Sequence, residues 1–166
     1  MCIRDSVERV LRHGGGAVNG AAFSSDGRRI ATAGENGEAR LWSVDGGLLR
    51  VLAGHQAPVN SVAFSPDGGS LVTASNDSDA RVWDLRSRVL RVRVLRGHSA
   101  VVSDASFSPD GRWIVTAGPV TVGVWEADPD RRIDERGPFR FLRGHASRVR
   151  SARAMRLGSW RQSWQM

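Results

Sequence analysis

The sequence predicts an all-β fold assembled from repeats, and three observations support this prediction. Histidines recur at intervals of 42, 43 and 47 residues, at His13, His55, His98 and His145. Aromatic residues recur in step with them, at Phe23, Phe64 and Phe107 and then at Trp42, Trp83 and Trp125. Between these landmarks, short strand-forming runs alternate with turn residues. A period of this length is typical of a repeat architecture in which each unit is one supersecondary structure.

The second unit shows the pattern most clearly. Its first apolar run, 59–64, ends in Ser-Pro-Asp-Gly, which is turn chemistry because proline presets φ and glycine accepts a positive φ. Further strand-like runs follow the first one, at 71–73, 80–83 and 90–95, with a second turn at 76–79. Four short strands separated by regular turns favour a sheet over helices.

The other units follow in order. Residues 7–11 match the fourth strand of an incomplete unit, and the first full unit has strand-like runs at 18–23, 30–33 and 38–42. The third unit keeps Phe107, the Ser-Pro-Asp-Gly turn and Thr116. Its next turn, at 118–120, is one residue shorter than in the other units. A charged loop at 126–138 then precedes another strand-like run and a fourth unit beginning at His145.

The unit resembles a WD repeat, on the evidence of several residues at fixed offsets. These are Gly54-His55, the Ser-Pro-Asp-Gly turn, Thr73, Asp77 and Trp83-Asp84. The resemblance implies that each unit is one four-stranded blade of a β-propeller. About three full blades with partial blades at both ends are too few to close a ring of roughly four to eight blades. We therefore expect an open segment, a fragment of a longer WD-repeat protein.

The predicted organisation has three parts. Residues 1–6 lie outside the repeats, and residues 7–152 form the array. Its units span about 13–54, 55–97 and 98–144, with a partial unit from 145. Residues 153–166 form a tail rich in arginine and tryptophan that replaces the expected strand, and we expect it, like residues 1–6, to be of doubtful origin.

The formal charge of +7 is concentrated at one end of the chain. From residue 137 onward there are seven arginines and no acidic side chain, so residues 1–136 balance 17 basic against 17 acidic groups. The single cysteine, Cys2, allows no internal disulfide, and no apolar run reaches membrane-spanning length. We expect a cytoplasmic protein with no membrane partner.

Four polar residues of the second unit are expected to form a structural network. In WD repeats, as this resemblance implies, His55, Thr73, Asp77 and Trp83 make a hydrogen-bonded chain. A buried indole has only one donor, which a strand threonine can satisfy. Partial versions are expected in the neighbouring units, where the acid is replaced or lost, at His13, Thr32, Asn36 and Trp42 and at His98, Thr116 and Trp125.

Catalysis and metal binding are the alternatives for these residues. A threonine, histidine and aspartate can form a catalytic triad, but this set recurs in every unit as structural residues do, and no G-x-S-x-G motif accompanies it. The histidine spacings match the repeat and not the short spacings of zinc ligands. We expect no catalytic residue, no metal and no cofactor.

The predicted function is a non-catalytic scaffold for protein–protein interaction within a larger regulatory or signalling protein. By resemblance, partners bind the rim formed by the loops before each first strand and the turns between second and third strands. We assign Glu35, Asn36, Gln56 and Asn76 to it. Exposed end blades predict that missing blades or self-association complete the array. The alternatives are the propeller portion of an enzyme, and nucleic-acid binding through the arginine-rich tail, which the balanced repeat region does not favour.

Overall fold

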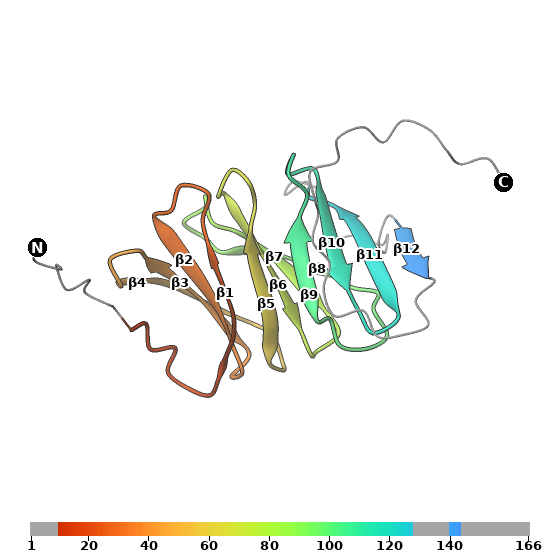
Figure 1. The fold of residues 1–166 in the computed structure, drawn as a ribbon, viewed down its shortest axis with the longest axis horizontal. Helices are drawn as coiled ribbons and strands as arrows, with labels where there is room; N and C mark the ends of the chain where they lie inside the picture. The colour runs from red at the N-terminus through yellow and green to blue at the C-terminus, as the bar shows by residue number, and fades with distance from the viewer. Residues whose placement is uncertain (1–9, 128–139, 144–166) are drawn as a thin grey trace, which may run out of the picture.

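The structure of this chain is a computed structural model that describes residues 10–127 and 140–143 (Figure 1). These residues form three four-stranded antiparallel sheets, which we call blades. The first blade contains β1 (Val18–Phe23), β2 (Arg29–Gly34), β3 (Glu38–Ser43) and β4 (Leu48–Ala53). The second contains β5 (Val59–Phe64), β6 (Ser70–Ser75), β7 (Ala80–Asp84) and β8 (Arg91–Leu95). The third contains β9 (Asp104–Phe107), β10 (Trp113–Ala117), β11 (Thr121–Glu126) and β12 (Arg140–Arg143).

The three blades stand in a row, and their ring is not closed (Figure 1). Strand order in each sheet follows the chain, and every neighbouring pair is antiparallel. The predicted all-β propeller segment is therefore confirmed. Among the described residues there is no helix of the length and apolar character needed to cross a membrane.

Where the observed bounds of a strand differ from the predicted ones, they differ by one or two residues. The predicted first strand, 18–23, has the observed bounds of β1, whereas β6 and β7 are longer than the runs 71–73 and 80–83. The strand β11 extends to Glu126, which the sequence pattern assigned to the charged loop. Residues 1–9, residues 128–138 of that loop, the fourth unit from His145 and the tail at 153–166 lie outside the described residues.

The turn between the first and second strands of each blade has a common construction. In the second blade, the Ser65 hydroxyl donates to the Asp67 carboxylate at 2.6 Å, and the same carboxylate accepts the Gly69 amide at 2.8 Å. Gly68 has a φ of 67°, where a side chain would be strained. The turn recognised in the sequence therefore owes its shape to an aspartate that holds the backbone and a glycine that permits its reversal.

Apolar side chains between adjacent blades form two cores. The first interface core joins the first and second blades through Ala31, Ala33, Ala39, Leu41, Leu52, Val59, Val62, Leu71 and Trp83. The second interface core joins the second and third blades through Val72, Ala74, Ala80, Val82, Leu95, Val102, Ala105, Phe107, Ile114 and Trp125. The described blades thus derive their burial from their neighbours as well as from their own strands.

Trp83 is the largest fully buried side chain of the first interface core. Replacing it in a Trp83→Ala variant removes the apolar contacts across two blades and the hydrogen bond of the indole. We expect the free energy of unfolding to fall by about 3–5 kcal/mol, measured by denaturant titration. The exposed Val44→Ala variant is the control and should change it by less than about 0.5 kcal/mol. Equal, small losses in both variants would contradict this packing.

Candidate functional site

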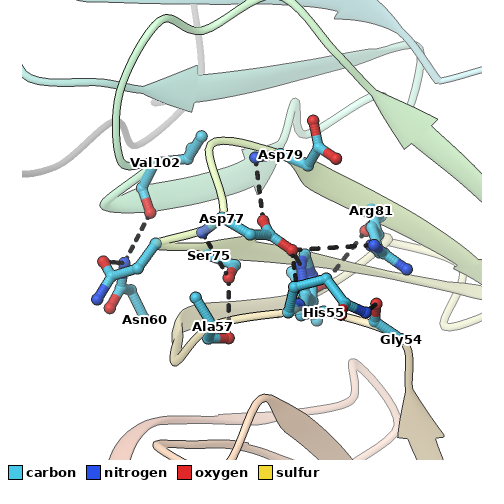
Figure 2. A network of polar contacts seen from close by, with 12 residues as sticks. Gly54, His55, Ala57, Asn60, Ser75, Asp77, Asp79, Arg81 and Val102 are labelled. Carbon is cyan, nitrogen blue, oxygen red and sulfur yellow. Dashed lines mark hydrogen bonds and ion pairs between the residues drawn. The ribbon is translucent and has the colours of Figure 1, made fainter.

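A continuous polar chain runs from the core of the second blade to its rim, and Figure 2 shows its outer members, His55 and Asp77. The Trp83 indole on β7 donates to the Thr73 hydroxyl on β6 at 2.9 Å, and that hydroxyl lies 2.8 Å from His55 Nε2. His55, in the loop before β5, places its Nδ1 2.8 Å from Asp77 Oδ2 in the turn between β6 and β7. The structure therefore brings together all four residues of the predicted network.

The hydrogen-bonding capacities of these groups determine the protonation of His55. A carboxylate can only accept, so the contact with Asp77 requires a proton on His55 Nδ1. In the neutral imidazole, Nε2 is then an acceptor for the Thr73 hydroxyl, whose oxygen accepts the indole proton of Trp83. Every member of the chain is satisfied without a charge on the imidazole.

Asp77 joins two loops of the rim. Its Oδ2 accepts the Gln56 backbone amide at 3.1 Å, and its Oδ1 accepts the Asp79 backbone amide at 3.1 Å. The Ser75 hydroxyl adds a second link, because it accepts the Asp77 amide and donates to the Ala57 carbonyl, each at 3.1 Å (Figure 2). The loop before β5 and the turn after β6 are thus held as one unit.

Burial and hydrogen bonding shift the pKa values of both titratable members of the chain, His55 and Asp77. Burial lowers the pKa of His55, although its hydrogen bond to Asp77 acts in the opposite direction. Burial acts to raise the pKa of Asp77, but hydrogen bonds from His55, Gln56 and Asp79 outweigh it and hold that pKa below its usual value. Neutral His55 beside ionised Asp77 is therefore the stable arrangement at neutral pH.

The third blade completes its chain with a residue that the sequence pattern did not identify. The Trp125 indole donates to the Thr116 hydroxyl at 2.8 Å, and His98 Nε2 lies 2.7 Å from the same oxygen. His98 Nδ1 is 3.2 Å from the Thr121 hydroxyl. The sequence signal was the turn shortened by one residue, which places a hydroxyl near the position of the missing acid.

The chain in the first blade ends early. The Trp42 indole donates to the Thr32 hydroxyl at 2.9 Å, but neither ring nitrogen of buried His13 has a hydrogen-bond partner among the described residues. Asn36, the expected neutral acceptor, instead donates to the Glu38 carboxylate at 3.0 Å and accepts the Glu38 amide at 3.2 Å. Its amide group is used within its own turn and is not bonded to the imidazole of His13.

The predicted partner-binding residues Glu35, Asn36, Gln56 and Asn76 are all exposed. Their side chains are nevertheless ordered by contacts within the rim. The Glu35 carboxylate accepts the Ala17 amide at 3.0 Å, the Gln56 amide donates to the Gly54 carbonyl at 3.1 Å, and Asn76 accepts from Asn60 at 2.8 Å. These side chains keep further donors and acceptors for a partner.

The chemically reactive groups of the polar chain are enclosed by protein. Thr73 is fully buried, and the side chain of His55 has no exposed surface. A nucleophile must reach the reacting atom of its substrate, so this hydroxyl is not placed for catalysis. Within residues 10–127 and 140–143, no group of three His, Cys, Asp or Glu side chains is arranged to hold a metal ion.

Removing the central hydroxyl tests the polar chain. The Thr73→Val variant preserves shape but leaves the Trp83 donor and the His55 acceptor unpaired, at a cost of about 1–3 kcal/mol for each buried group. The matched Thr121→Val variant changes the half-buried outer end of the chain in the third blade. Denaturant titration should show a larger loss for Thr73→Val, and equal losses would contradict a central role for its hydroxyl.

The lowered pKa of His55 makes stability depend on pH. Because the unfolded chain binds this proton more tightly, the contribution of neutral His55 is complete above its ordinary pKa of about 6.5 and is lost as pH falls toward the lowered value. His13 and His98 act in the same direction, since burial lowers the pKa of both. Unfolding free energy should therefore decrease between about pH 7.5 and 5.

A His55→Gln variant is the control for this pH dependence. It removes one of the three imidazoles that the described part of the chain contains and should reduce the slope of stability against pH, even though it also lowers stability at every pH. Asp79 acts in the opposite direction, because burial and Asp77 raise its pKa above the ordinary value of about 3.8. Its contribution to stability is lost as pH rises from about 3.8, so the Asp79→Asn variant should change the profile at its acid end. A slope unaffected by His55→Gln would show that this imidazole does not titrate differently on folding.

Comparison with known proteins agrees with this geometry. The family model described as WD domain, G-beta repeat matches residues 6–43, 46–84 and 90–119. Two similar solved structures, described as "Structure of U3-55K" and "Crystal structure of RRP9 WD40 repeats", each have a TM-score of 0.76 and 23% sequence identity over 86% of this chain. Those matches cover 44% and 43% of the two solved chains, respectively. No curated protein sequence matches.

The two solved structures are similar to this chain in fold, and the family model identifies the repeats. The three matched stretches together cover more than half of the chain. They include the indole, hydroxyl and imidazole positions of the polar chains in the first two blades. The chain therefore belongs to the WD-repeat family.

Proposed function

We propose that this chain is part of a non-catalytic scaffold that binds protein partners through its rim. The rim consists of the loops before β1, β5 and β9 and of the turns that follow β2, β6 and β10. The observation that carries the proposal is the polar chain of the second blade, which anchors exposed rim residues to a buried tryptophan. The WD-repeat family is in general a family of interaction scaffolds, which supports the same reading.

Rigidity makes the rim suitable for binding. Association costs free energy when flexible side chains and loops become ordered at an interface. Asp77 accepts amide protons from both adjoining rim segments, so these segments are ordered before any partner arrives. The free-energy cost of ordering these segments on binding is therefore smaller.

The chemistry of the rim suits the polar groups of a protein. Asn36, Gln56 and Asn76 present side-chain amides, which donate and accept hydrogen bonds, and Glu35 presents a carboxylate. The rim carries few positive charges to match phosphate groups, and residues 1–136 are balanced in formal charge. These features favour a protein partner over a nucleic acid.

Two alternative functions, an enzyme and a nucleic-acid-binding protein, would require different features of the chain. A propeller portion of an enzyme needs accessible reactive groups, whereas the hydroxyl and imidazole of the second blade are enclosed. Nucleic-acid binding would depend on the arginines beyond residue 137, most of which lie outside the described residues.

We propose that the scaffold works in the cytoplasm as part of a larger regulatory or signalling protein.

A matched pair of triple variants tests the rim. The rim variant combines Glu35→Ala, Gln56→Ala and Asn76→Ala. The control combines Ser25→Ala, Arg28→Ala and Arg112→Ala, which are exposed residues at the first turn of their blades, on the opposite edge. Proteins captured by the wild-type chain from cells of its source should be retained by the control and lost by the rim variant.

The captured partner is then purified and its affinity measured against all three proteins. We expect the rim variant to bind at least about tenfold more weakly, because several interface groups are truncated together. The control should bind as the wild type does. Unchanged binding by the rim variant, or loss of binding by the control alone, would show that partners do not use this rim.

A further inference from the structure

Every described blade has two different faces, which follow from its place in the row. We call the side toward the preceding blade the leading face and the side toward the following blade the trailing face. The leading face of the second blade supplies Val59, Val62, Leu71 and Trp83 to the first interface core. Its trailing face supplies Val72, Ala74, Ala80, Val82 and Leu95 to the second. A trailing face packing on a leading face is thus an interaction that occurs twice within this chain.

The leading face of the first blade has the same kind of residues, but no other blade packs on it within residues 10–127 and 140–143. Val18 corresponds to Val59 and Val102, which are fully buried, yet it is 47% exposed. Phe23 is 65% exposed, whereas its counterpart Phe107 is 8% exposed. An irregularity between Val18 and Gly20 shifts the alternation of β1 by one residue, so Val18 and Phe23 share one sheet face, as Val59 and Phe64 do in the second blade. Within the described part of the chain, no blade packs on this apolar face.

The trailing face of the third blade also has apolar side chains that are more exposed than their counterparts in the other blades. Leu142 on β12 is 49% exposed, although its counterparts Leu52 and Leu95 are buried in the two interface cores. Val122 and Val124 on β11 are half-buried. Among the described residues, both halves of the interaction that joins successive blades therefore carry exposed apolar side chains, one half on the first blade and one on the third. These two blades stand at opposite ends of the row (Figure 1).

A polar contact between successive blades also recurs, in which an arginine of the fourth strand donates to a carbonyl of the next blade. The third blade has the arginine of this contact. Arg50 on β4 donates to the Ser87 carbonyl of the next blade at 3.2 Å, and Arg93 on β8 donates to the Glu126 carbonyl at 2.7 Å. Both acceptors lie at or just beyond the end of a third strand. Arg140 occupies the same position on β12 and is exposed, and the first blade has the corresponding turn at 43–47.

We propose that the trailing face of the third blade binds the leading face of the first blade in a second copy of this chain. Leu142, Val122 and Val124 then cover Phe23 and Val18 of the other copy, and Arg140 donates to its turn at 43–47. This interaction uses the two end faces of the row and leaves the rim available for other partners. It therefore does not depend on the rim-binding function proposed above.

A second copy fits these faces because each chain carries one face of each kind. Packing leading face on trailing face is a head-to-tail contact, which closes a ring when its rotation allows and otherwise continues as a chain of copies. The chain spans somewhat less than half of the solved chains with the same fold.

One hydrogen bond of the two internal interfaces has no counterpart in the proposed contact between copies. Asn19 and Asn60, each at an irregularity in its first strand, donate to the Val59 and Val102 carbonyls of the next blade at 2.9 and 2.8 Å. The third blade has Ser103 at this position, whose hydroxyl donates to the Ala117 carbonyl of its own blade. We expect association between copies to be weaker than the internal contacts and to depend on concentration.

Light scattering of the full chain and two single variants tests the proposal. Phe23→Asp places a charge on the leading face and Leu142→Asp places one on the trailing face, both at exposed positions. The wild type should show at least twice the monomer mass in a dilution series, and each variant alone should be a monomer. Val89→Asp alters an exposed valine between β7 and β8, away from both end faces, and should associate as the wild type does.

Mixing the two variants distinguishes head-to-tail contact from any symmetric one. One intact leading face and one intact trailing face meet in the mixture, so association should return as a dimer. Circular dichroism checks that each variant retains the β-sheet signal of the wild type. A wild-type chain that is monomeric at every concentration, variants that associate unchanged, or a mixture that stays monomeric would each overturn the proposal.

Discussion

Burial of Trp83 between two blades is the interaction on which the rest of this structure depends. Its ring fills the first interface core, and its single polar group must then find an acceptor inside the protein. Thr73 supplies that acceptor, and the bonding continues through His55 to Asp77 at the surface. One apolar contact thereby fixes the position of a rim loop, because each polar group along the route needs the next.

The same dependence explains why the three blades differ in their rims. Where an aspartate is present, the imidazole has a strong acceptor that also holds two loop amides. In the third blade Thr121 takes the outer position, and in the first blade the chain ends at Thr32. The second blade therefore has the most firmly anchored rim, with neighbours packed on both of its faces.

Much of the fold and part of the site could be predicted from the sequence. The strand bounds followed from alternating apolar runs and turn residues, because these depend on local geometry. The contacts among His55, Thr73, Asp77 and Trp83 were anticipated from the family resemblance. The role of Thr121 at the outer end of the third chain was missed, because the shortened turn at 118–120 signalled a change without showing which side chain would reach His98. Asn36 was expected to face the imidazole, but its bond to Glu38 competes successfully within a short turn.

The sequence by itself determined that the chain forms four-stranded units and where their turns lie, since turn residues and strand periodicity act over a few positions. It also determined that each unit contains a tryptophan needing an acceptor. Only the tertiary structure decided which faces of the blades are covered, which partner each histidine finds and which apolar residues remain exposed at the two ends. Those outcomes depend on contacts between residues about twenty to forty positions apart, and local sequence preferences do not specify such contacts.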